Sequence, residues 1–388
     1  MTFETVKGYS DYTGDDAKKR QRIKEIVEET FRRYNFEPAE TPVIEDEKFV
    51  KGENSNDEAV SDVYKLQDKG ERKLALRYEF TFQLKRLANN KKLPYKRYQI
   101  GYVFRDEPIT GNRVRQITQC DIDVVGSTLK DEAEILKAFS ELLEKLGIKS
   151  TIKINNRKLL NEILEELKIE EKYRPDVIRE IDKLDKLSKT EVKQNLKKYN
   201  AEKALEVFEK PVKYFEKYKS YQEIKDLLTI CDYYNLEPEF TPYLARGLGY
   251  YNGTIFEIKT KEIKETVCGG GSYLVNGIQS TGISVSIERL FVLAKVNIEE
   301  EKVLIISLNE DKSAIELAKK IRELNIPCSV MYNKVSKALD YANSYKIKYV
   351  LFVGEDEVKK KKFKLKDMAS GKEKLISEKD FEKEIKLS

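Results

Sequence analysis

Two neighbouring segments of the chain alternate between apolar and polar side chains, and this pattern constrains the fold more than any other feature. Residues 97–105 and 113–125 are separated by the turn-rich stretch DEPITGN, so the sequence predicts two antiparallel strands joined by a loop. Arg105 points away from the apolar face of the first strand, which carries Tyr98, Ile100, Tyr102 and Phe104. On the second strand the alternation separates Val114, Thr118, Cys120, Ile122 and Val124 from Arg113, Arg115, Gln119, Asp121 and Asp123. The polar face is either solvated or the floor of a polar binding site.

The other segments predict an α/β protein whose body combines an antiparallel sheet with helices. A helix is expected from about Asp15 to Tyr34, with Ile23, Ile26, Val27 and Phe31 on its buried face. Thr13 and Asp16 resemble a capping box at the start of this helix. Residues 157–232 are rich in lysine and glutamate and carry repeated helical patterns, which predict a helical insertion.

The last part of the chain alternates strand-like and helical stretches. From VLIISL to YVLFVG the pattern is that of a small α/β domain with a mostly parallel sheet, and KFKLKDMASGKEKLI predicts a closing hairpin. We therefore expect four segments, which are residues 1–156, 157–232, 233–298 and 301–388.

Composition limits the chemistry that this chain can use. It has no histidine, which excludes Ser-His and Cys-His dyads and imidazole-ligated metals. Its four cysteines are scattered without a CxxC pair, so free thiols are more plausible than disulfides or a zinc ribbon. No apolar run is long enough to span a bilayer and MTFETVKGYS lacks the features of a signal peptide, so we expect a cytoplasmic protein.

The positive charge is concentrated at one end of the chain. Residues 301–388 contain 20 Lys+Arg and 15 Asp+Glu, whereas residues 1–300 contain 53 of each, so the net charge of +5 lies in the tail. A basic tail on a neutral body suits a nucleic-acid partner, although from charge alone a solvated lysine-rich face is the preferred interpretation.

Two common nucleotide-binding motifs are absent from the sequence. It has neither a GxxxxGK[ST] phosphate loop nor a GxGxxG after a strand. Arginines are the remaining candidates for phosphate binding, because a guanidinium stays protonated and can donate two parallel hydrogen bonds to phosphate oxygens.

Five blocks in order resemble the histidyl-tRNA synthetase family of class II aminoacyl-tRNA synthetases. VFRDE with RQITQCDIDVVG resembles motif 2, and GISVSIERL (282–290) resembles motif 3. ARGLGYYNGTIFE (245–257) resembles a stretch peculiar to this family, and KGYSDY, LRYEFT and the tail also match. The resemblance implies a class II catalytic body with an antiparallel sheet flanked by helices, a helical insertion and a C-terminal α/β anticodon-binding domain.

The resemblance also implies how ATP is held. Arg105 and Arg289 would bind the ATP phosphates, Glu107 and Arg113 would lie at the nucleotide, and Arg246 would stabilise charge at the α-phosphate. Mg²⁺ would accompany the phosphates, with no metal-ligating side chain assigned. Without these motifs, Arg246 would be read as an ordinary loop arginine and Arg289 as one partner of a surface salt bridge.

The same resemblance implies a histidine pocket. Glu79, Thr81 and Gln119 would bind the α-amino group, Asp123 and Tyr251 would bond the two imidazole nitrogens, and Tyr273 would close the pocket. Gln119 and Asp123 are four residues apart on a strand and therefore share a face. Gly269, Gly270 and Gly271 would leave room for the substrate, although such a run taken alone is more often a turn.

The implied activity is the joining of L-histidine to tRNA(His) through a histidyl-adenylate, with a homodimer formed through the first helix and the strand around Pro42. Three positions depart from the family pattern, namely Ser286, Gly249 and Phe80. One alternative is a non-catalytic paralogue that senses histidine or regulates an enzyme. Another is a related synthetase for glycine, threonine or proline.

Overall fold

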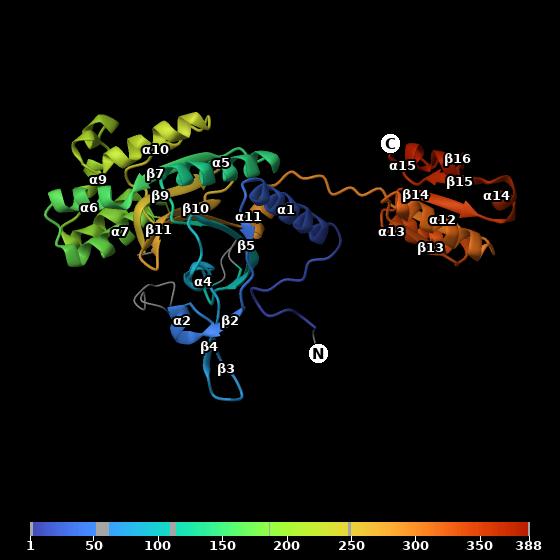
Figure 1. Cartoon of the computed structure of the whole chain (residues 1–388), viewed down its shortest axis with the longest axis horizontal. Coiled ribbons are helices and arrows are strands. Elements are labelled where there is room, and N and C mark those ends of the chain that lie inside the picture. Colours follow the sequence, from blue (N-terminus) through green and yellow to red (C-terminus); the bar gives the residue numbers. More distant parts are fainter. Residues whose placement is uncertain (1–2, 52–61, 109–113, 186, 247–249, 387–388) are drawn as a thin grey trace. The chain divides into compact units, whose positions relative to one another are not determined.

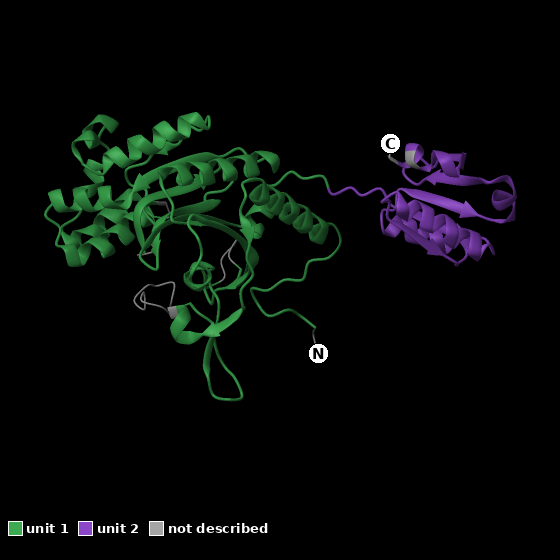
Figure 2. Ribbon diagram, in the orientation of Figure 1, with its two compact units in different colours: residues 1–297 green, residues 298–388 purple. Residues whose placement is uncertain are grey.

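The computed structural model describes residues 3–51, 62–108, 114–185, 187–246 and 250–386. The chain divides into two compact units, Met1–Asn297 and Ile298–Ser388 (Figures 1 and 2). Each unit has its own hydrophobic core. Within the described residues, no helix is both long and apolar enough to cross a membrane.

An eight-stranded sheet forms the centre of unit 1, in the order β1-β5-β6-β11-β10-β9-β7-β8. Its neighbours are antiparallel from β5 to β7, and only the short strands β1 and β8 pair in parallel at the two edges. The strands are β1 (Glu37–Pro38), β5 (Tyr95–Phe104), β6 (Gln116–Val125), β7 (Thr151–Asn156), β8 (Glu239–Phe240), β9 (Tyr251–Lys259), β10 (Cys268–Val275) and β11 (Ile278–Ser286). The predicted antiparallel pair is thus confirmed as β5 and β6, the second and third strands in this order.

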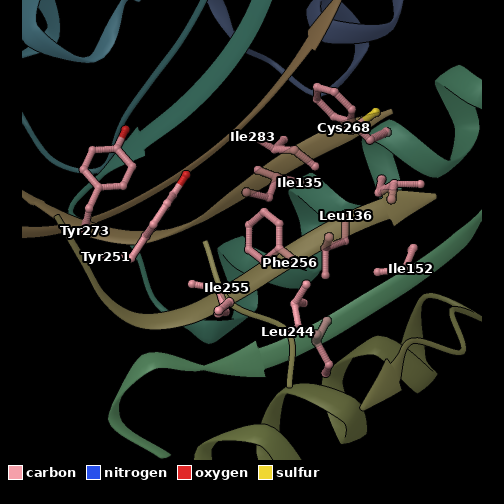
Figure 3. Packing of buried hydrophobic residues seen from close by; sticks show 14 of the residues in the cluster. Ile135, Leu136, Ile152, Leu244, Tyr251, Ile255, Phe256, Cys268, Tyr273 and Ile283 are labelled. Atoms are coloured by element: carbon pink, nitrogen blue, oxygen red, sulfur yellow. The ribbon is translucent and has the colours of Figure 1, made fainter. Parts of the chain in front are cut away.

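Helices cover the apolar face of this sheet. The covering helices include α1 (Gly14–Arg33), α5 (Leu129–Lys145), α10 (Tyr221–Tyr233) and α11 (Ile287–Leu293), and α1 and α10 both contact α5. Cys120, Ile122 and Val124 of β6 are fully buried in the same core as the α1 residues that the sequence placed on one face. Figure 3 shows this packing around Phe256, with Ile135 and Leu136 of α5. The predicted apolar face of β5 is less uniform, because Tyr102 is 44% exposed.

The capping box predicted at the start of α1 is wrong. Thr13 is the N-cap residue, but its side chain makes no capping hydrogen bond. Gly14 has a φ of 55°, so the first turn does not present its N–H groups to Thr13 in the usual way. A capping box does form on α5, where Thr128 and Asp131 bond reciprocally.

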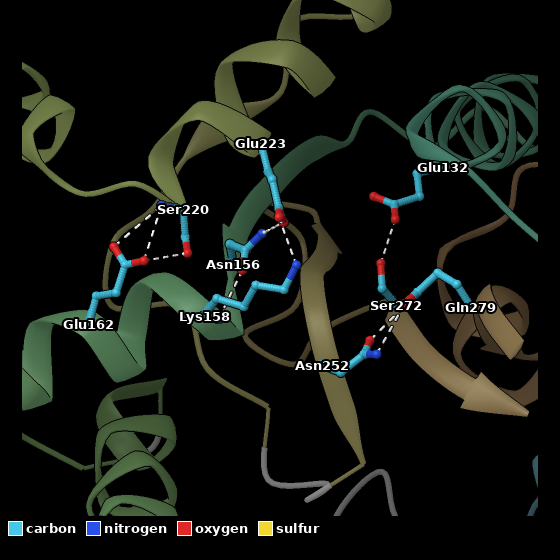
Figure 4. Close-up of polar contacts among 9 residues, drawn as sticks. All are labelled: Glu132, Asn156, Lys158, Glu162, Ser220, Glu223, Asn252, Ser272 and Gln279. Atoms are coloured by element: carbon cyan, nitrogen blue, oxygen red, sulfur yellow. Dashed lines mark hydrogen bonds and ion pairs between the residues drawn. The ribbon is translucent and has the colours of Figure 1, made fainter. Parts of the chain in front are cut away.

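The segment expected to be a helical insertion does consist of helices, and it shares the core of the sheet. Its elements before α10 are α6 (Arg157–Glu166), η1 (Glu171–Tyr173), α7 (Arg174–Asp182), η2 (Lys183–Asp185), α8 (Lys189–Leu196), η3 (Lys197–Tyr199), α9 (Ala204–Val207) and η4 (Val212–Lys217). Helix α6 contacts β9, and α10 contacts β7. Polar bonds add to this packing, because Glu223 of α10 accepts from the Asn156 amide at the end of β7 (Figure 4).

A three-stranded sheet precedes β5. It contains β2 (Ile44–Asp46), β3 (Lys65–Gln67) and β4 (Lys73–Leu76), with α2 (Glu47–Lys51) and α4 (Thr81–Leu87) beside it. Arg86 of α4 donates two hydrogen bonds to Glu45 of β2, at 3.1 and 2.8 Å. This pair fixes α4 and therefore the LRYEFT segment that leads into it.

Unit 2 is the predicted small α/β domain. Its strands β12 (Val303–Ser307), β13 (Cys328–Met331) and β14 (Tyr349–Val353) are parallel, and β15 (Lys362–Asp367) and β16 (Glu373–Ser377) form the predicted hairpin. Its helices are α12 (Asp311–Glu323), α13 (Val335–Ser344), α14 (Glu355–Lys360), η5 (Glu378–Asp380) and α15 (Phe381–Lys386). Two hydrophobic clusters use alternate residues of β12, so both faces of the sheet are covered.

A carboxyl group is buried between α5 and the sheet. Glu132 is 4% exposed, and Ser272 of β10 donates its hydroxyl to it (Figure 4). Burial raises the pKa of Glu132 to about 7, with Glu223 and Asp131 adding to the rise and bonds from Ser272 and Thr254 opposing it. Because the folded pKa lies above the unfolded one, the folded state is favoured at low pH and loses stability as pH rises through about 7.

We therefore expect Glu132→Gln to stabilise the protein above pH 7 by roughly 2–3 kcal/mol relative to its effect at pH 5. Urea unfolding of both proteins at pH 5 and 8 measures this difference, and unit 2 contributes equally to the unfolding of both proteins. Glu144→Gln is the matched control, because it makes the same substitution on the exposed side of the same helix and removes no buried carboxyl group. Parallel stability curves for Glu132→Gln and the original chain would show that the Glu132 carboxyl does not titrate in this range.

Candidate active site

The polar face of the central strands is a buried floor and not a solvated surface. Gln119, Asp121 and Asp123 of β6 are 7%, 5% and 4% exposed. Strand register places Asp123 opposite Arg97 of β5 on one side and opposite Gly282 of β11 on the other. This burial excludes the solvated interpretation of the alternating pattern, and binding at this floor stays a prediction.

Asp123 is held on this floor by one ion pair and one hydrogen bond. The Arg97 Nη2 atom lies 2.8 Å from the Asp123 Oδ2 atom, and the hydroxyl of Tyr273 on β10 donates to the other carboxylate oxygen. Burial raises the pKa of Asp123, while the positive charge of Arg97 and the Tyr273 hydrogen bond lower it. Gly282 is required here, because a Cβ atom at this position would lie 2.1 Å from Asp123 Oδ1.

Three tyrosines form one wall beside Asp123. Tyr250 lies between the other two, with ring centroids 4.8 Å from Tyr251 and 5.6 Å from Tyr273. Figure 3 shows the Tyr251 and Tyr273 rings projecting in the same direction from β9 and β10. The structure therefore brings together Asp123, Tyr251 and Tyr273, which the sequence assigned to the imidazole and to pocket closure.

Glu79 lies just before α4, and Thr81 begins this helix. Glu79 is 7% exposed, and its charge raises the pKa values of Asp121 and Tyr250, which places it near both the floor and the tyrosine wall. Thr81 is half-buried as the first residue of α4. The structure thus adds a third carboxylate to the region of Asp121 and Asp123.

Three arginines lie close to one another at the other end of the floor. Arg289 is in the first turn of α11, and burial lowers its pKa, as do the nearby charges of Arg105 and Arg246. Among the described residues, no carboxylate lies within ion-pair distance of Arg289, so the surface salt bridge considered for it is absent from this part of the structure. Converging like charges at a helix N-terminus are suited to binding an anion such as phosphate.

The other two arginines are anchored by neighbouring groups. Arg105 follows β5 and donates to the Gln119 Oε1 atom at 3.3 Å, which links the arginine cluster to the floor. Arg246 pairs with Glu257 of β9 at 3.0 Å. Burial lowers the pKa of the Arg246 guanidinium, but the charges of Tyr251 and Glu257 raise it by more than burial lowers it. The pKa of Arg246 is therefore above its usual value.

The glycine run lies in strand β10 and is not a turn. A Cβ atom at Gly269 would lie 1.9 Å from the Arg246 Nη1 atom, and one at Gly270 would lie 2.1 Å from the backbone oxygen of Gly282. The first glycine gives space to an arginine side chain, and the second allows close packing against β11. The absence of a side chain at Gly269 and Gly270 therefore makes room for Arg246 and for strand β11.

Two of the three departures from the family pattern have clear local contacts. Ser286 is the N-cap of α11 and accepts from the Arg289 N–H at 3.3 Å. Phe80 is fully buried, and its carbonyl accepts from Arg97 Nη2 at 3.3 Å. Gly249, the third departure, and Arg113, an expected nucleotide residue, lie outside the described residues.

Glu107 is less informative than the other expected residues. It lies beyond the end of β5 and is half-buried, and its backbone carbonyl accepts from Arg115 Nε at 3.4 Å. Its expected role beside the nucleotide stays a prediction.

Two residues of the floor received no role from the sequence, although a signal was available. Arg97 shares its face of β5 with Arg105, eight residues later, so the alternation already placed it among the polar side chains. Asp121 stands between Gln119 and Asp123 on the polar face of β6. The pattern could not show that the side chains of Arg97 and Asp121 are buried, or which residues of other segments they contact.

Comparison with known proteins agrees with this geometry. Residues 8–290 match the family model described as histidyl-tRNA synthetase, and residues 302–387 match an anticodon binding domain. The chain is 32% identical to "Histidine--tRNA ligase 1" of Bacillus cereus, over 96% of this chain and 97% of that protein. It is also 32% identical to "Histidine--tRNA ligase" of Wolinella succinogenes, over 96% of each.

Solved structures share the fold. The histidyl-tRNA synthetase from Nostoc sp. PCC 7120 superposes with a TM-score of 0.87 at 23% identity, covering 100% of this chain and 99% of that one. A structure titled as an ATP phosphoribosyltransferase regulatory subunit/histidyl-tRNA synthetase from Bacillus halodurans C has a TM-score of 0.77 at 18% identity, covering 91% of this chain and 98% of that one. Family models over both units and full-length relatives above 30% identity show that this chain belongs to the histidyl-tRNA synthetase family of aminoacyl-tRNA ligases.

Proposed function

We propose that this protein joins L-histidine to tRNA(His) in two steps and uses ATP. The observation that carries the proposal is the buried Asp123, which lies on the same strand as the Gln119 that bonds Arg105 of the three-arginine cluster. A carboxylate with aromatic neighbours suits an imidazole, and clustered guanidinium groups suit phosphates. The two halves of a histidine and ATP site are therefore adjacent.

In the first step an oxygen of the histidine carboxylate attacks the α-phosphorus of ATP. The bond between the α-phosphorus and pyrophosphate breaks, pyrophosphate leaves with the electron pair, and histidyl-adenylate forms. Arg246 and Arg289 offset the negative charge that shifts during this attack. Mg²⁺ bound to ATP would shield the charge of the leaving phosphates. In the second step a ribose hydroxyl of the tRNA attacks the carbonyl carbon of histidyl-adenylate and loses its proton. An ester bond to the tRNA forms, the acyl–phosphate bond breaks, and AMP leaves with the electron pair.

Specificity is assigned to the floor and the tyrosine wall. Asp123 and Tyr251 bond the two ring nitrogens, Glu79, Thr81 and Gln119 bind the α-amino group, and Tyr273 holds Asp123 in place. Asp123 is pre-oriented by Arg97, so histidine meets an acceptor that needs little rearrangement.

Pyrophosphate exchange tested with each amino acid in turn decides this proposal. Exchange that depends on histidine supports it, whereas exchange with glycine, threonine or proline supports the related synthetases. Histidine binding without any exchange supports the regulatory alternative, a function that is also named for the structural neighbour from Bacillus halodurans C.

We further propose a cytoplasmic homodimer, with residues 1–156 and 233–298 as the catalytic body and 157–232 as the insertion. Helix α1 and the chain through Pro42 would form the dimer interface. The exposure of Val43 and Ile44, at 38% and 50%, supports an apolar contact in this region. Analytical ultracentrifugation should give a dimer, and Ile44→Asp should shift it towards monomer.

Residues 301–388 are proposed to supply affinity for tRNA and not the activation chemistry. Unit 1 has its own core, so a chain that ends at Val296 should fold and retain histidine-dependent pyrophosphate exchange. Its affinity for tRNA should fall, and its salt dependence should weaken, because the surplus of positive charge is removed. Equal tRNA binding by both chains across a salt series would refute this assignment.

A further inference from the structure

Asp121 is a buried carboxyl group that has no role in the function proposed above. It lies on the floor between Gln119 and Asp123, and its Oδ2 atom accepts from Gln119 Nε2 at 2.9 Å. Its Oδ1 atom is buried and has no hydrogen-bond partner among the described residues. Asp121 thus contacts one of the side chains assigned to the histidine α-amino group.

Gln119 has a donor end and an acceptor end, and the two ends face different neighbours. Its Nε2 atom faces Asp121, while its Oε1 atom accepts from Arg105 Nη2 at 3.3 Å. An ionised carboxylate can only accept hydrogen bonds, so it holds the NH₂ end of the amide, and the oxygen is turned towards Arg105 and the site. A positively charged ammonium group requires an oxygen at that position.

We propose that Asp121 is a positioning residue for histidine recognition, because its carboxylate orients Gln119 so that the amide oxygen faces the substrate ammonium group. This inference rests on the proposed function and names a determinant of its amino-acid specificity. Asp121 does not touch the reacting atoms, and it acts through Gln119.

The charged groups around Asp121 make this orientation dependent on pH. Asp123 lies beside it on β6, Arg97 lies on β5, and Glu79 approaches from the segment before α4. Burial raises the pKa of Asp121 to about 8, and Asp123 and Glu79 add to the rise, while Arg97 and the Gln119 bond oppose it. When Asp121 is protonated, its hydroxyl can donate to the Gln119 oxygen, and the NH₂ end of Gln119 then turns towards Arg105 and the substrate.

The experiment measures histidine affinity in the original chain and in Asp121→Asn from pH 6.5 to 9. Asparagine has the shape and neutrality of the protonated carboxyl and does not force one orientation of Gln119. At each pH the histidine KM of the variant is divided by that of the original chain, and the two Kd values from calorimetry are compared in the same way. This ratio removes the effect of the ionisation of histidine itself. We expect the variant to bind histidine about 10- to 100-fold more weakly at pH 9, as for loss of a hydrogen bond to a charged group.

At pH 6.5 the two proteins should differ by less than about threefold, because Asp121 is then protonated in the original chain. The KM for ATP should change little at any pH. Glu132→Gln is the matched control, since it removes another buried carboxyl of raised pKa that bonds Ser272 and no residue assigned to histidine. Its ratio to the original chain should not vary with pH.

A ratio for Asp121→Asn that is constant with pH, or affinities equal to those of the original chain, would overturn the inference. A merely structural defect would give such a constant ratio, with ATP and histidine affected alike. If the original chain binds histidine but exchanges no pyrophosphate, the proposed function fails while the calorimetric ratio still tests the role of Asp121. If it binds no histidine at all, both proposals are wrong.

Discussion

Asp123→Ala is expected to abolish measurable histidine activation and to destabilise unit 1. The substitution removes the acceptor proposed for the imidazole and leaves Arg97, which is fully buried, without its carboxylate. Removing one partner of a buried ion pair typically costs about 3–5 kcal/mol. The remaining site would also leave the polar groups of histidine unpaired, which penalises the substrate further.

Two measurements separate these effects. Urea unfolding reports the loss of stability, and equilibrium binding of histidine and of ATP at a temperature where the variant is folded reports specificity. Glu134→Ala is the matched control, because it breaks a partly buried ion pair with Lys96 in the same unit, outside the site. An equal loss of affinity for histidine and ATP would contradict the specific role of Asp123.

Arg246→Ala is expected to slow adenylate formation by about 10²–10³-fold, or roughly 2.7–4 kcal/mol. The guanidinium is fixed by Glu257, so it needs no reorganisation when negative charge shifts at the α-phosphate. Histidine binding should change little. Transfer to tRNA from preformed histidyl-adenylate should be affected less, because the pyrophosphate bond is already broken.

Single-turnover kinetics at saturating ATP measure this effect. Lys259→Ala removes a second cation that lies 3.4 Å from the same Glu257 carboxylate, and it should leave the activation rate nearly unchanged. Glu257 also accepts from the Thr266 hydroxyl, so it keeps a partner when Arg246 is removed. An unchanged activation rate in Arg246→Ala, or a loss confined to histidine affinity, would remove Arg246 from the catalytic residues.

Local patterns in the sequence were sufficient for much of the fold. The alternation in residues 97–105 and 113–125 predicted the central strands β5 and β6, because side chains of a strand point alternately to its two faces. The order of strands and helices after residue 301 likewise predicted the sheet of unit 2. Prediction failed at Thr13, where a single backbone angle at Gly14 decided whether the capping bond could form.

By itself, the sequence determined the family, the strand faces and the chemical types available at the site. Tertiary structure decided whether the polar face of β6 is solvated or buried, since that depends on Arg97, Gly282 and Tyr273 from three other strands. It also decided that Arg289 lies near Arg105 and Arg246, which are far from it in the chain. Periodicity fixes the direction of a side chain, whereas burial and electrostatic partners depend on which distant segments pack against it.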